Sequence, residues 1–191
     1  MSPMFRKLCL LMSLTSIILF AGAERPSAQT RVSIGVTETI ETLNPYGDSV
    51  SLLYGIWSEI TGPFCTYNYE KGDFEGRLAE RWKVENPNTW LFYLNKSYRF
   101  NDGSEVTADD VVHSMMNRVI KDPQSKQKAS VAGPIVKAEA VDKHTVRFTT
   151  DKPSAPLLGF VCDRLVVTSK AMFDKYGRDV AHKEHMLGAG P

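Results

Sequence analysis

The stretch Phe100–Val119, FNDGSEVTADDVVHSMMNRV, holds the most informative local pattern in this 191-residue chain. Its Asp102-Gly103 pair favours a tight turn. Thr107 and Asp110 have the spacing of a capping box, which satisfies free amides at a helix N-terminus. An apolar stripe of helical period follows at Val111, Val112, Met115, Met116 and Val119. The stretch therefore predicts a turn that leads into a capped, amphipathic helix.

Strand pairs are predicted on both sides of this helix. The pattern predicts a strand over Phe64–Tyr69. It also predicts two hairpins. The first pairs Trp82–Val84 with Trp90–Leu94, and the second pairs Lys137–Val141 with Val146–Thr150. Further strands are predicted at Arg31–Val36 and Leu165–Val167, further helices at Ser51–Ile60, Pro153–Phe160 and Ser169–Tyr176, and a polar loop at Asp122–Ser130. Helices and strands are interleaved along the chain, which indicates an α/β fold.

Composition and motifs narrow the function classes. Hydrophobic residues make up 42% of the chain and charged residues 24%, as in ordinary globular proteins. A formal net charge of +1 supplies no basic field for nucleic acid, so no nucleic-acid partner is expected. The sequence has no Gly-x-Ser-x-Gly, Walker or His-Glu-x-x-His motif, so we expect no enzyme and no cofactor. His182-x-x-His185 is the one metal-like spacing, and two histidines do not complete a site.

The first 23 residues have the order of a secretory signal peptide. Arg6 and Lys7 precede the apolar run Leu8–Phe20, and Ala21-Gly22-Ala23 supplies small residues at a cleavage site. An uncleaved anchor is the alternative, although the run is shorter than the roughly 20 residues that span a membrane. The pattern predicts export of a chain that begins at Glu24.

Cys65 and Cys162 remain in the exported chain. An oxidising compartment would permit a disulfide between them. The alternative is two buried free thiols, because free cysteines often behave as small hydrophobic residues.

Six segments carry a resemblance to one protein family. In chain order they are Glu41–Pro45, Leu78–Trp82, Trp90–Leu94 with Phe100–Ser104, Val106–Ser114, Ala140–Val146 and Gly188–Pro191. Together they resemble the family 5 extracellular solute-binding proteins, which serve peptide, oligopeptide and nickel ABC importers. Asn44 departs from the aspartate that is usual in the first segment, and Asn95-Lys96-Ser97 departs from the usual basic-glycine turn.

The resemblance implies a periplasmic-binding-protein-like fold and a chain that corresponds to the N-terminal portion of such a protein. Residues 24–191 would then contain parts of one ligand lobe, at 31–61 and 166–191. Residues 62–165 would form a mixed α+β accessory subdomain. Such a fragment is expected to keep an ordered accessory subdomain and to bind no peptide tightly by itself.

The resemblance also implies a periplasmic, monomeric receptor that delivers a peptide to ABC permease subunits. Its ligand-facing candidates are Asp48, Ser49, Val50, Ser51 and Tyr54, where short polar side chains and loop amides would pair with a peptide backbone. An ordinary helix start explains the same serines. Alternative ligands within the family are nickel chelates, sugars and opines, and the competing class is a secreted enzyme or structural domain without a transporter.

Export gives the first testable prediction. The chain produced in a Gram-negative host is expected in the periplasmic fraction with Glu24 as its first residue, and N-terminal sequencing checks both points. Intact Met1 on cytoplasmic protein would contradict the signal-peptide interpretation.

Overall fold

The computed structural model describes Gly35 and residues 44–47, 51–178 and 187–190. The chain divides into two units, Met1–Gly35 and Val36–Pro191, and every element described below belongs to the second. Of the predicted strand at Arg31–Val36 only Gly35 is described, and the His182/His185 pair lies outside the described residues. Among the helices that are described, none is long and apolar enough to cross a membrane.

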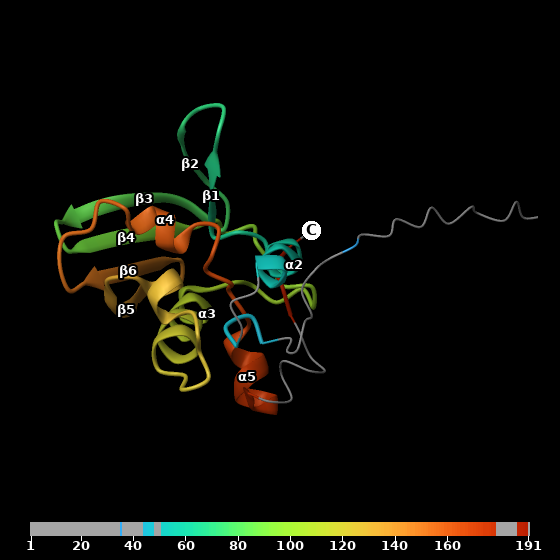
Figure 1. Cartoon of the computed structure of the whole chain (residues 1–191). Helices are drawn as coiled ribbons and strands as arrows, with labels where there is room; N and C mark the ends of the chain where they lie inside the picture. Colours follow the sequence, from blue (N-terminus) through green and yellow to red (C-terminus); the bar gives the residue numbers. More distant parts are fainter. Residues whose placement is uncertain (1–34, 36–43, 48–50, 179–186, 191) are drawn as a thin grey trace, which may run out of the picture. The chain divides into compact units, whose positions relative to one another are not determined.

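The larger of the two described sheets has four antiparallel strands (Figure 1). Its strands are β3 (Ala79–Asn86), β4 (Thr89–Leu94), β6 (Thr145–Thr150) and β5 (Ile135–Asp142), in that spatial order. Two hairpins, β3–β4 and β5–β6, are joined through the β4–β6 pair. Both hairpins were predicted from sequence and are confirmed, although β3 begins at Ala79, earlier than the predicted Trp82.

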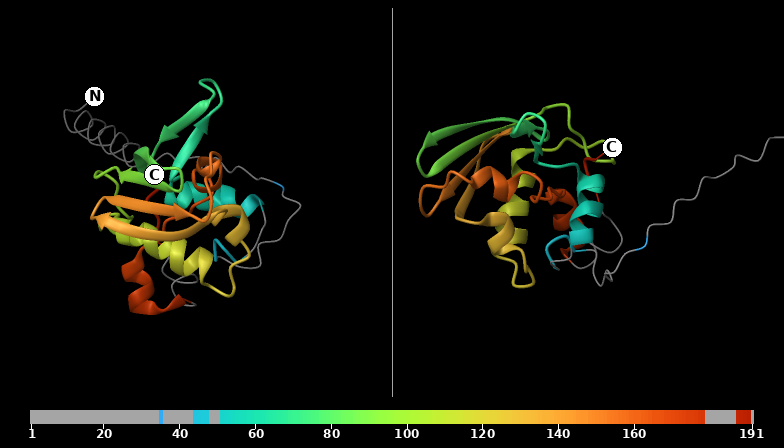
Figure 2. Two further views of the ribbon diagram at one scale, coloured as in Figure 1. Left: turned by 90° about the vertical axis from the view of Figure 1, so that its left-hand side faces the viewer. Right: turned by 45° about the horizontal axis from the view of Figure 1, so that its top comes forward.

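Two shorter strands, β1 (Cys65–Asn68) and β2 (Asp73–Gly76), pair separately. They form a hairpin that projects from the four-stranded sheet, as Figure 1 and the left view of Figure 2 show. The Gly72 φ angle of 67° explains why glycine occupies the turn, because that region costs other residues steric strain.

The core depends on alternating burial along β4 and β6. The first two residues of each strand are both buried, and from the second residue on buried positions alternate with half-buried ones. Three buried rings meet in this core. Phe92 lies 5.3 Å from Phe64 and 5.2 Å from Phe148 between ring centroids. Aromatic pairs at this spacing add about 0.5–1.5 kcal/mol beyond the area they bury.

The helix predicted after Thr107 is present, but its winding changes partway. Residues Ala108–Val112 form the α-helix α3, and His113–Ile120 continue it as a π-helix, η1. The bond from Lys121 N–H to the carbonyl of Met116, 3.0 Å, has the five-residue spacing of a π turn. This helix packs against β5 and β6. The predicted helix is therefore confirmed, and its second half has a wider winding that the apolar stripe did not specify.

The predicted capping box is present, and Asp110 does more than complete it. Its Oδ2 accepts hydrogen bonds from the backbone N–H of Thr107 (2.9 Å) and from the Thr107 hydroxyl (2.7 Å). Its Oδ1 accepts from the backbone N–H of Lys170 (2.8 Å), at the start of α5 (Lys170–Tyr176). Ser114 adds a second link, because its hydroxyl accepts from the backbone N–H of Thr168 (3.1 Å). The α3–η1 helix and the segment before α5 are thus held together by polar bonds.

The remaining helices were also expected. Helix α2 (Ser51–Thr61) and α4 (Leu157–Val161) match predicted helices, and the hydroxyl of Ser169 caps α5 by accepting from Met172 N–H (3.3 Å). A short π-helix, η2 (Lys128–Ala132), occupies the end of the predicted loop Asp122–Ser130.

The predicted strand at Leu165–Val167 was wrong. All three residues are buried, as their apolar character indicated, but none pairs in a described ladder. An apolar run predicts burial, and a strand needs in addition a neighbour with free backbone groups.

Residues Gly188–Gly190 lie against the end of α2. The N–H of Gly190 donates to the carbonyl of Ile60 (3.0 Å), which the helix itself leaves without a partner. A Cβ at Gly188 would lie 1.9 Å from that same oxygen. Only glycine permits this close approach of the two backbones.

A disulfide joins Cys65, at the start of β1, to Cys162, directly after α4. Both cysteines are buried, and 97 positions separate them in the sequence. The closed loop contains all six strands, α3, η1, η2 and α4. In the chain-entropy account, cross-linking a loop of about 100 residues stabilises a fold by roughly 4.7 kcal/mol, and removal of native disulfides typically costs about 2–5 kcal/mol.

The second prediction concerns this bond. The double variant Cys65→Ala/Cys162→Ala is expected to unfold with a free energy lower by about 2–5 kcal/mol, because its unfolded chain is no longer cross-linked. Urea titration followed by circular dichroism measures the change. The unmodified chain treated with dithiothreitol is the control and should unfold at a similarly reduced urea concentration. Equal midpoints for the variant and the oxidised chain would show that the bond adds no stability.

Candidate functional site

The ligand-facing residues expected from sequence lie at and before the start of α2. Asp48, Ser49 and Val50 lie outside the described residues. Ser51 and Tyr54 belong to the first turn of α2, and their side chains are also outside what the structure describes. Their role therefore stays a prediction, and the described residues show how the chain is held immediately before them.

The segment Asn44–Gly47, which leads into this region, is anchored by Tyr46. The Tyr46 side chain is 1% exposed, and its hydroxyl donates a hydrogen bond to the carbonyl of Val166. Its own carbonyl accepts from the backbone N–H of Lys126 (2.9 Å). Residues from three distant parts of the sequence thus meet at one tyrosine. No periodicity signalled this contact, because Tyr46 stands in a turn.

Asn44 organises the same turn. Its Oδ1 accepts from the N–H of Tyr46 (3.1 Å), and its carbonyl accepts from the N–H of Gly47 (3.0 Å). This is an Asx turn, for which an asparagine or an aspartate oxygen serves equally. The departure from the family's usual aspartate therefore leaves this hydrogen bond intact.

A buried ion cluster lies at the end of η1, in the segment that starts the predicted loop Asp122–Ser130. Arg118 Nη1 lies 2.6 Å from Asp122 Oδ2, and both side chains are almost fully buried. Arg178 Nη1 lies 3.3 Å from the other oxygen of Asp122. Asp122 Oδ1 also accepts from the N–H of Gln124 (2.9 Å). Buried charges are tolerated when paired and hydrogen-bonded in this way, so the cluster fixes the loop whose Lys126 holds Tyr46.

His113 lies on η1 next to this cluster and against α5. Its ring centroid is 5.2 Å from that of Phe173, and its Nδ1 is buried without a hydrogen-bond partner. Burial, and secondly the positive charge of Arg118, lower the pKa of His113 from its ordinary 6.5. The folded protein therefore favours the neutral imidazole.

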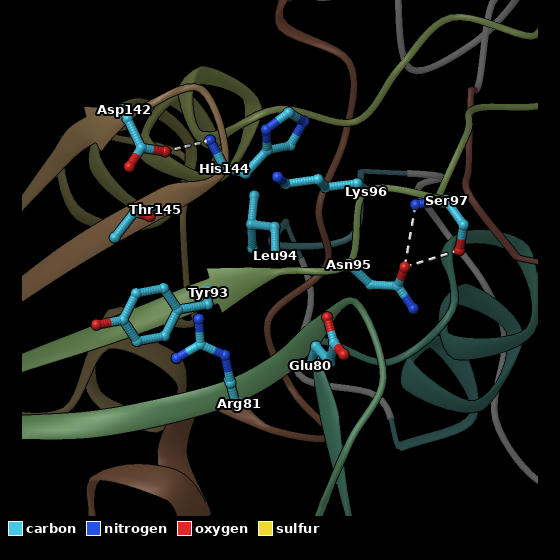
Figure 3. Close-up of a pocket in the computed structure, with 10 residues that line it drawn as sticks. All are labelled: Glu80, Arg81, Tyr93, Leu94, Asn95, Lys96, Ser97, Asp142, His144 and Thr145. Carbon is cyan, nitrogen blue, oxygen red and sulfur yellow. Dashed lines mark hydrogen bonds between the residues drawn. The ribbon is translucent and has the colours of Figure 1, made fainter.

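A second polar feature is a surface cleft of about 690 Å³ at one end of the four-stranded sheet (Figure 3). We call it the strand-end cleft. Residues from β3, from the end of β4 and its following turn, and from the β5–β6 turn line it: Glu80, Arg81, Tyr93, Leu94, Asn95, Lys96, Ser97, Asp142, His144 and Thr145.

Charges next to this cleft are largely paired. Glu105 accepts from Lys143 Nζ (2.7 Å), and one of its oxygens lies 2.6 Å from His144 Nε2. These hydrogen bonds, that of Lys143 foremost, lower the pKa of Glu105 to about 2. Asp142 accepts from the N–H of His144 (2.8 Å), and this bond lowers the pKa of Asp142. Within the described part of the chain, no group of three or more histidine, cysteine or acidic residues is arranged to hold a metal ion.

Comparison with known proteins identifies what the chain is similar to. The sequence model of bacterial extracellular solute-binding proteins, family 5, matches residues 73–191. The probable D,D-dipeptide-binding periplasmic protein DdpA of Escherichia coli K12 is 33% identical over 124 residues, which are 62% of this chain and 23% of DdpA. The glutathione-binding protein GsiB of E. coli O1:K1 is 24% identical over 166 residues, covering 86% of this chain and 32% of GsiB.

Solved structures agree with the sequence matches. The binding protein MoaA of A. tumefaciens R10, solved in complex with mannopinic acid, superposes with a TM-score of 0.66. It is 28% identical, and the match covers 78% of this chain and 31% of that one. This similarity confirms the predicted α/β, periplasmic-binding-protein-like fold class. The chain spans between about a quarter and a third of the length of these relatives.

The third prediction follows from His113. Because its pKa is lowered in the folded state, the unfolded chain binds a proton more readily, and stability is lost as the pH falls below about 6.5. The unfolding free energy is therefore expected to decrease between pH 7.5 and 5.5, and to decrease less in His113→Gln. Urea titrations of both proteins at several pH values measure the two slopes. Identical slopes would show that His113 titrates alike in both states.

Proposed function

Because the chain belongs to the bacterial extracellular solute-binding proteins of family 5, we propose that it is part of a periplasmic receptor that binds peptides for an ABC importer. The observation that carries this proposal is the family match over residues 73–191. DdpA and GsiB are named for binding D,D-dipeptides and glutathione, and both relatives support peptides as the ligand class.

The residues that precede the proposed ligand-facing segment support the receptor role in one respect. Tyr46, Asn44 and the Asp122 cluster hold the chain just before Asp48–Ser51, so the proposed ligand-facing segment starts from a fixed point. Preorganised polar groups bind a ligand at a lower entropy cost than groups that must first become ordered. We place the peptide backbone against the polar groups of Asp48–Ser51 and the ring of Tyr54. Ligand would close two lobes about a hinge, and the closed form would dock on the permease.

The proposal extends to location and domain organisation. Residues 1–23 act as a cleaved signal peptide, and DdpA is itself named a periplasmic protein. Residues 62–165 act as the accessory subdomain, and residues 31–61 and 166–191 contribute to one ligand lobe. The mature receptor is proposed to act as a monomer.

An opine is the second candidate ligand, and one observation favours it. MoaA, which was solved with mannopinic acid, is 28% identical to this chain. A peptide and an opine both carry carboxylate and amine groups, so the same short polar side chains could receive either.

The fourth prediction tests the ligand class with the whole gene product. D-Ala-D-Ala, glutathione and mannopinic acid are each added during thermal unfolding. A ligand present at 100 times its Kd is expected to add about 2.7 kcal/mol to the unfolding free energy, which raises the melting temperature by several degrees. A shift with either peptide supports the proposal, a shift with mannopinic acid alone makes the protein an opine receptor, and no shift with any of the three contradicts both.

A matched pair of variants tests the ligand-facing segment. Ser51→Ala is expected to weaken binding of the ligand so identified by about tenfold, the loss of roughly one hydrogen bond. Ser58→Ala is the control, because its hydroxyl donates within the same helix to the carbonyl of Gly55 (2.8 Å). Equal affinities for the two variants would remove Ser51 from the site.

A further inference from the structure

Residues 188–190 lie between two elements that are far from them in the sequence. The N–H of Gly190 donates a hydrogen bond to the carbonyl of Ile60 (3.0 Å), at the end of α2. The carbonyl of Gly188 accepts from the N–H of Asn101 (2.9 Å), in the loop that leads from β4 to α3. We call Gly188-Ala189-Gly190 the glycine strap. It is bonded on one side to α2 and on the other to the loop before α3.

The glycine strap meets α2 as backbone against backbone. A Cβ on Gly190 would lie 2.2 Å from the carbonyl oxygen of Glu59. A Cβ on Gly188 would lie 1.9 Å from that of Ile60. Non-bonded heavy atoms pack best at about 3.5–4.0 Å, so a side chain at either position would push the strap away from the helix by roughly 1–2 Å. Such a displacement would break the hydrogen bond from Gly190 to Ile60, because an N–H to carbonyl bond spans about 2.7–3.2 Å.

The same end of α2 is also held through the chain that follows it. The N–H of Gly62 donates to the carbonyl of Ser58 (2.9 Å) and so closes the last turn of the helix. Phe64 is fully buried, and its ring lies 5.3 Å from that of Phe92 in the four-stranded sheet. The carbonyl of Phe64 accepts from the N–H of Ala79 (2.7 Å), at the start of β3. The end of α2 is therefore fixed to the sheet by the chain itself and to the loop before α3 by the glycine strap.

We propose that the glycine strap is the positioning element of α2 and makes α2 and the four-stranded sheet move as one body when ligand binds. The inference rests on the proposed function, in which Ser51 at the start of α2 faces the ligand. The helix has 11 residues and a length of about 16 Å, so a tilt at its end displaces Ser51 at its start. A contact between two backbones has no flexible side chain to absorb such a displacement, and closely packed interiors transmit strain. The strap thus keeps the ligand-facing groups preorganised, which lowers the entropy cost of binding.

The fifth prediction is tested first without ligand, on the whole gene product. Gly190→Ala is expected to increase amide hydrogen exchange of residues 58–61 by about tenfold, because the helix end loses roughly one hydrogen bond and opens more often. Amides of β4 and β6 are expected to keep their exchange rates. Gly159→Ala is the matched control, since this glycine lies on α4 and an added Cβ would meet nothing within 4 Å.

The second measurement is ligand affinity, which a contact that only adds stability would not change in the folded protein. The probe is whichever of D-Ala-D-Ala, glutathione and mannopinic acid the unmodified protein binds. Gly190→Ala is expected to weaken its binding by about tenfold under conditions in which circular dichroism shows the variant folded, and Gly159→Ala to leave it unchanged. Ala189→Gly loosens the strap without a steric clash and is expected to change exchange and affinity in the same direction by a smaller factor. It replaces Gly190→Ala if that variant does not fold.

Three results would overturn the proposal. Unchanged exchange at the end of α2 would show that the strap does not hold the helix. Equally faster exchange in α2, β4 and β6 would indicate a general loss of stability. Faster exchange in α2 with unchanged affinity would make the strap a structural contact without a part in binding. If the unmodified protein binds none of the three ligands, the proposed function fails, and the exchange rates still decide whether the strap holds α2.

Discussion

The carboxylate of Asp110 serves two helix starts at once. One oxygen satisfies the N–H and hydroxyl of Thr107 ahead of α3, and the other satisfies the N–H of Lys170 at the start of α5. Asp110 is only 6% exposed, so water cannot readily replace these bonds. A side chain without the carboxylate would leave three donors to be satisfied elsewhere, each at a cost of about 1–3 kcal/mol if left buried and unpaired. Asp110 is therefore one of two residues, with Ser114, that hold the sheet-bound helix to the segment before α5.

A covalent constraint complements this polar one. The Cys65–Cys162 bond closes a loop that begins just after Gly62 and ends just before Leu165, near the limits proposed for the accessory subdomain. The strands of the sheet, the aromatic core around Phe92 and the α3–η1 helix all lie within that loop. Segments outside it are attached to it by polar contacts: the N–H of Lys170 donates to Asp110, the N–H of Lys126 to the carbonyl of Tyr46, and the N–H of Asn101 to the carbonyl of Gly188. The unit thus combines a cross-linked part with segments attached by backbone hydrogen bonds.

Local sequence patterns predicted most of the described elements and few of the contacts between them. Both hairpins around Asn86–Asn88 and Asp142–His144 follow from turn residues between alternating strands, and the cap at Thr107 follows from its spacing to Asp110. The π winding of η1 did not follow, because an apolar stripe tolerates more than one helical pitch. Leu165–Val167 was predicted as a strand because a short apolar run is typical both of a buried strand and of a buried segment that pairs with no other strand.

Features at the candidate sites were harder to predict because they depend on residues far apart in sequence. Tyr46 contacts Val166, which is 120 positions away in the sequence, and Arg178 contacts Asp122, which is 56 positions away. The strand-end cleft brings together three chain segments: the start of β3, the end of β4 with its following turn, and the β5–β6 turn. They share only their position at the same end of the sheet. Once the order β3–β4–β6–β5 is known, that meeting is required, since in an antiparallel sheet the start of β3 lies beside the end of β4 and the start of β6. The β3–β4 hairpin by itself brings Arg81 close to Lys96. Strand order, which no local pattern encodes, adds the β5–β6 turn to the same cleft.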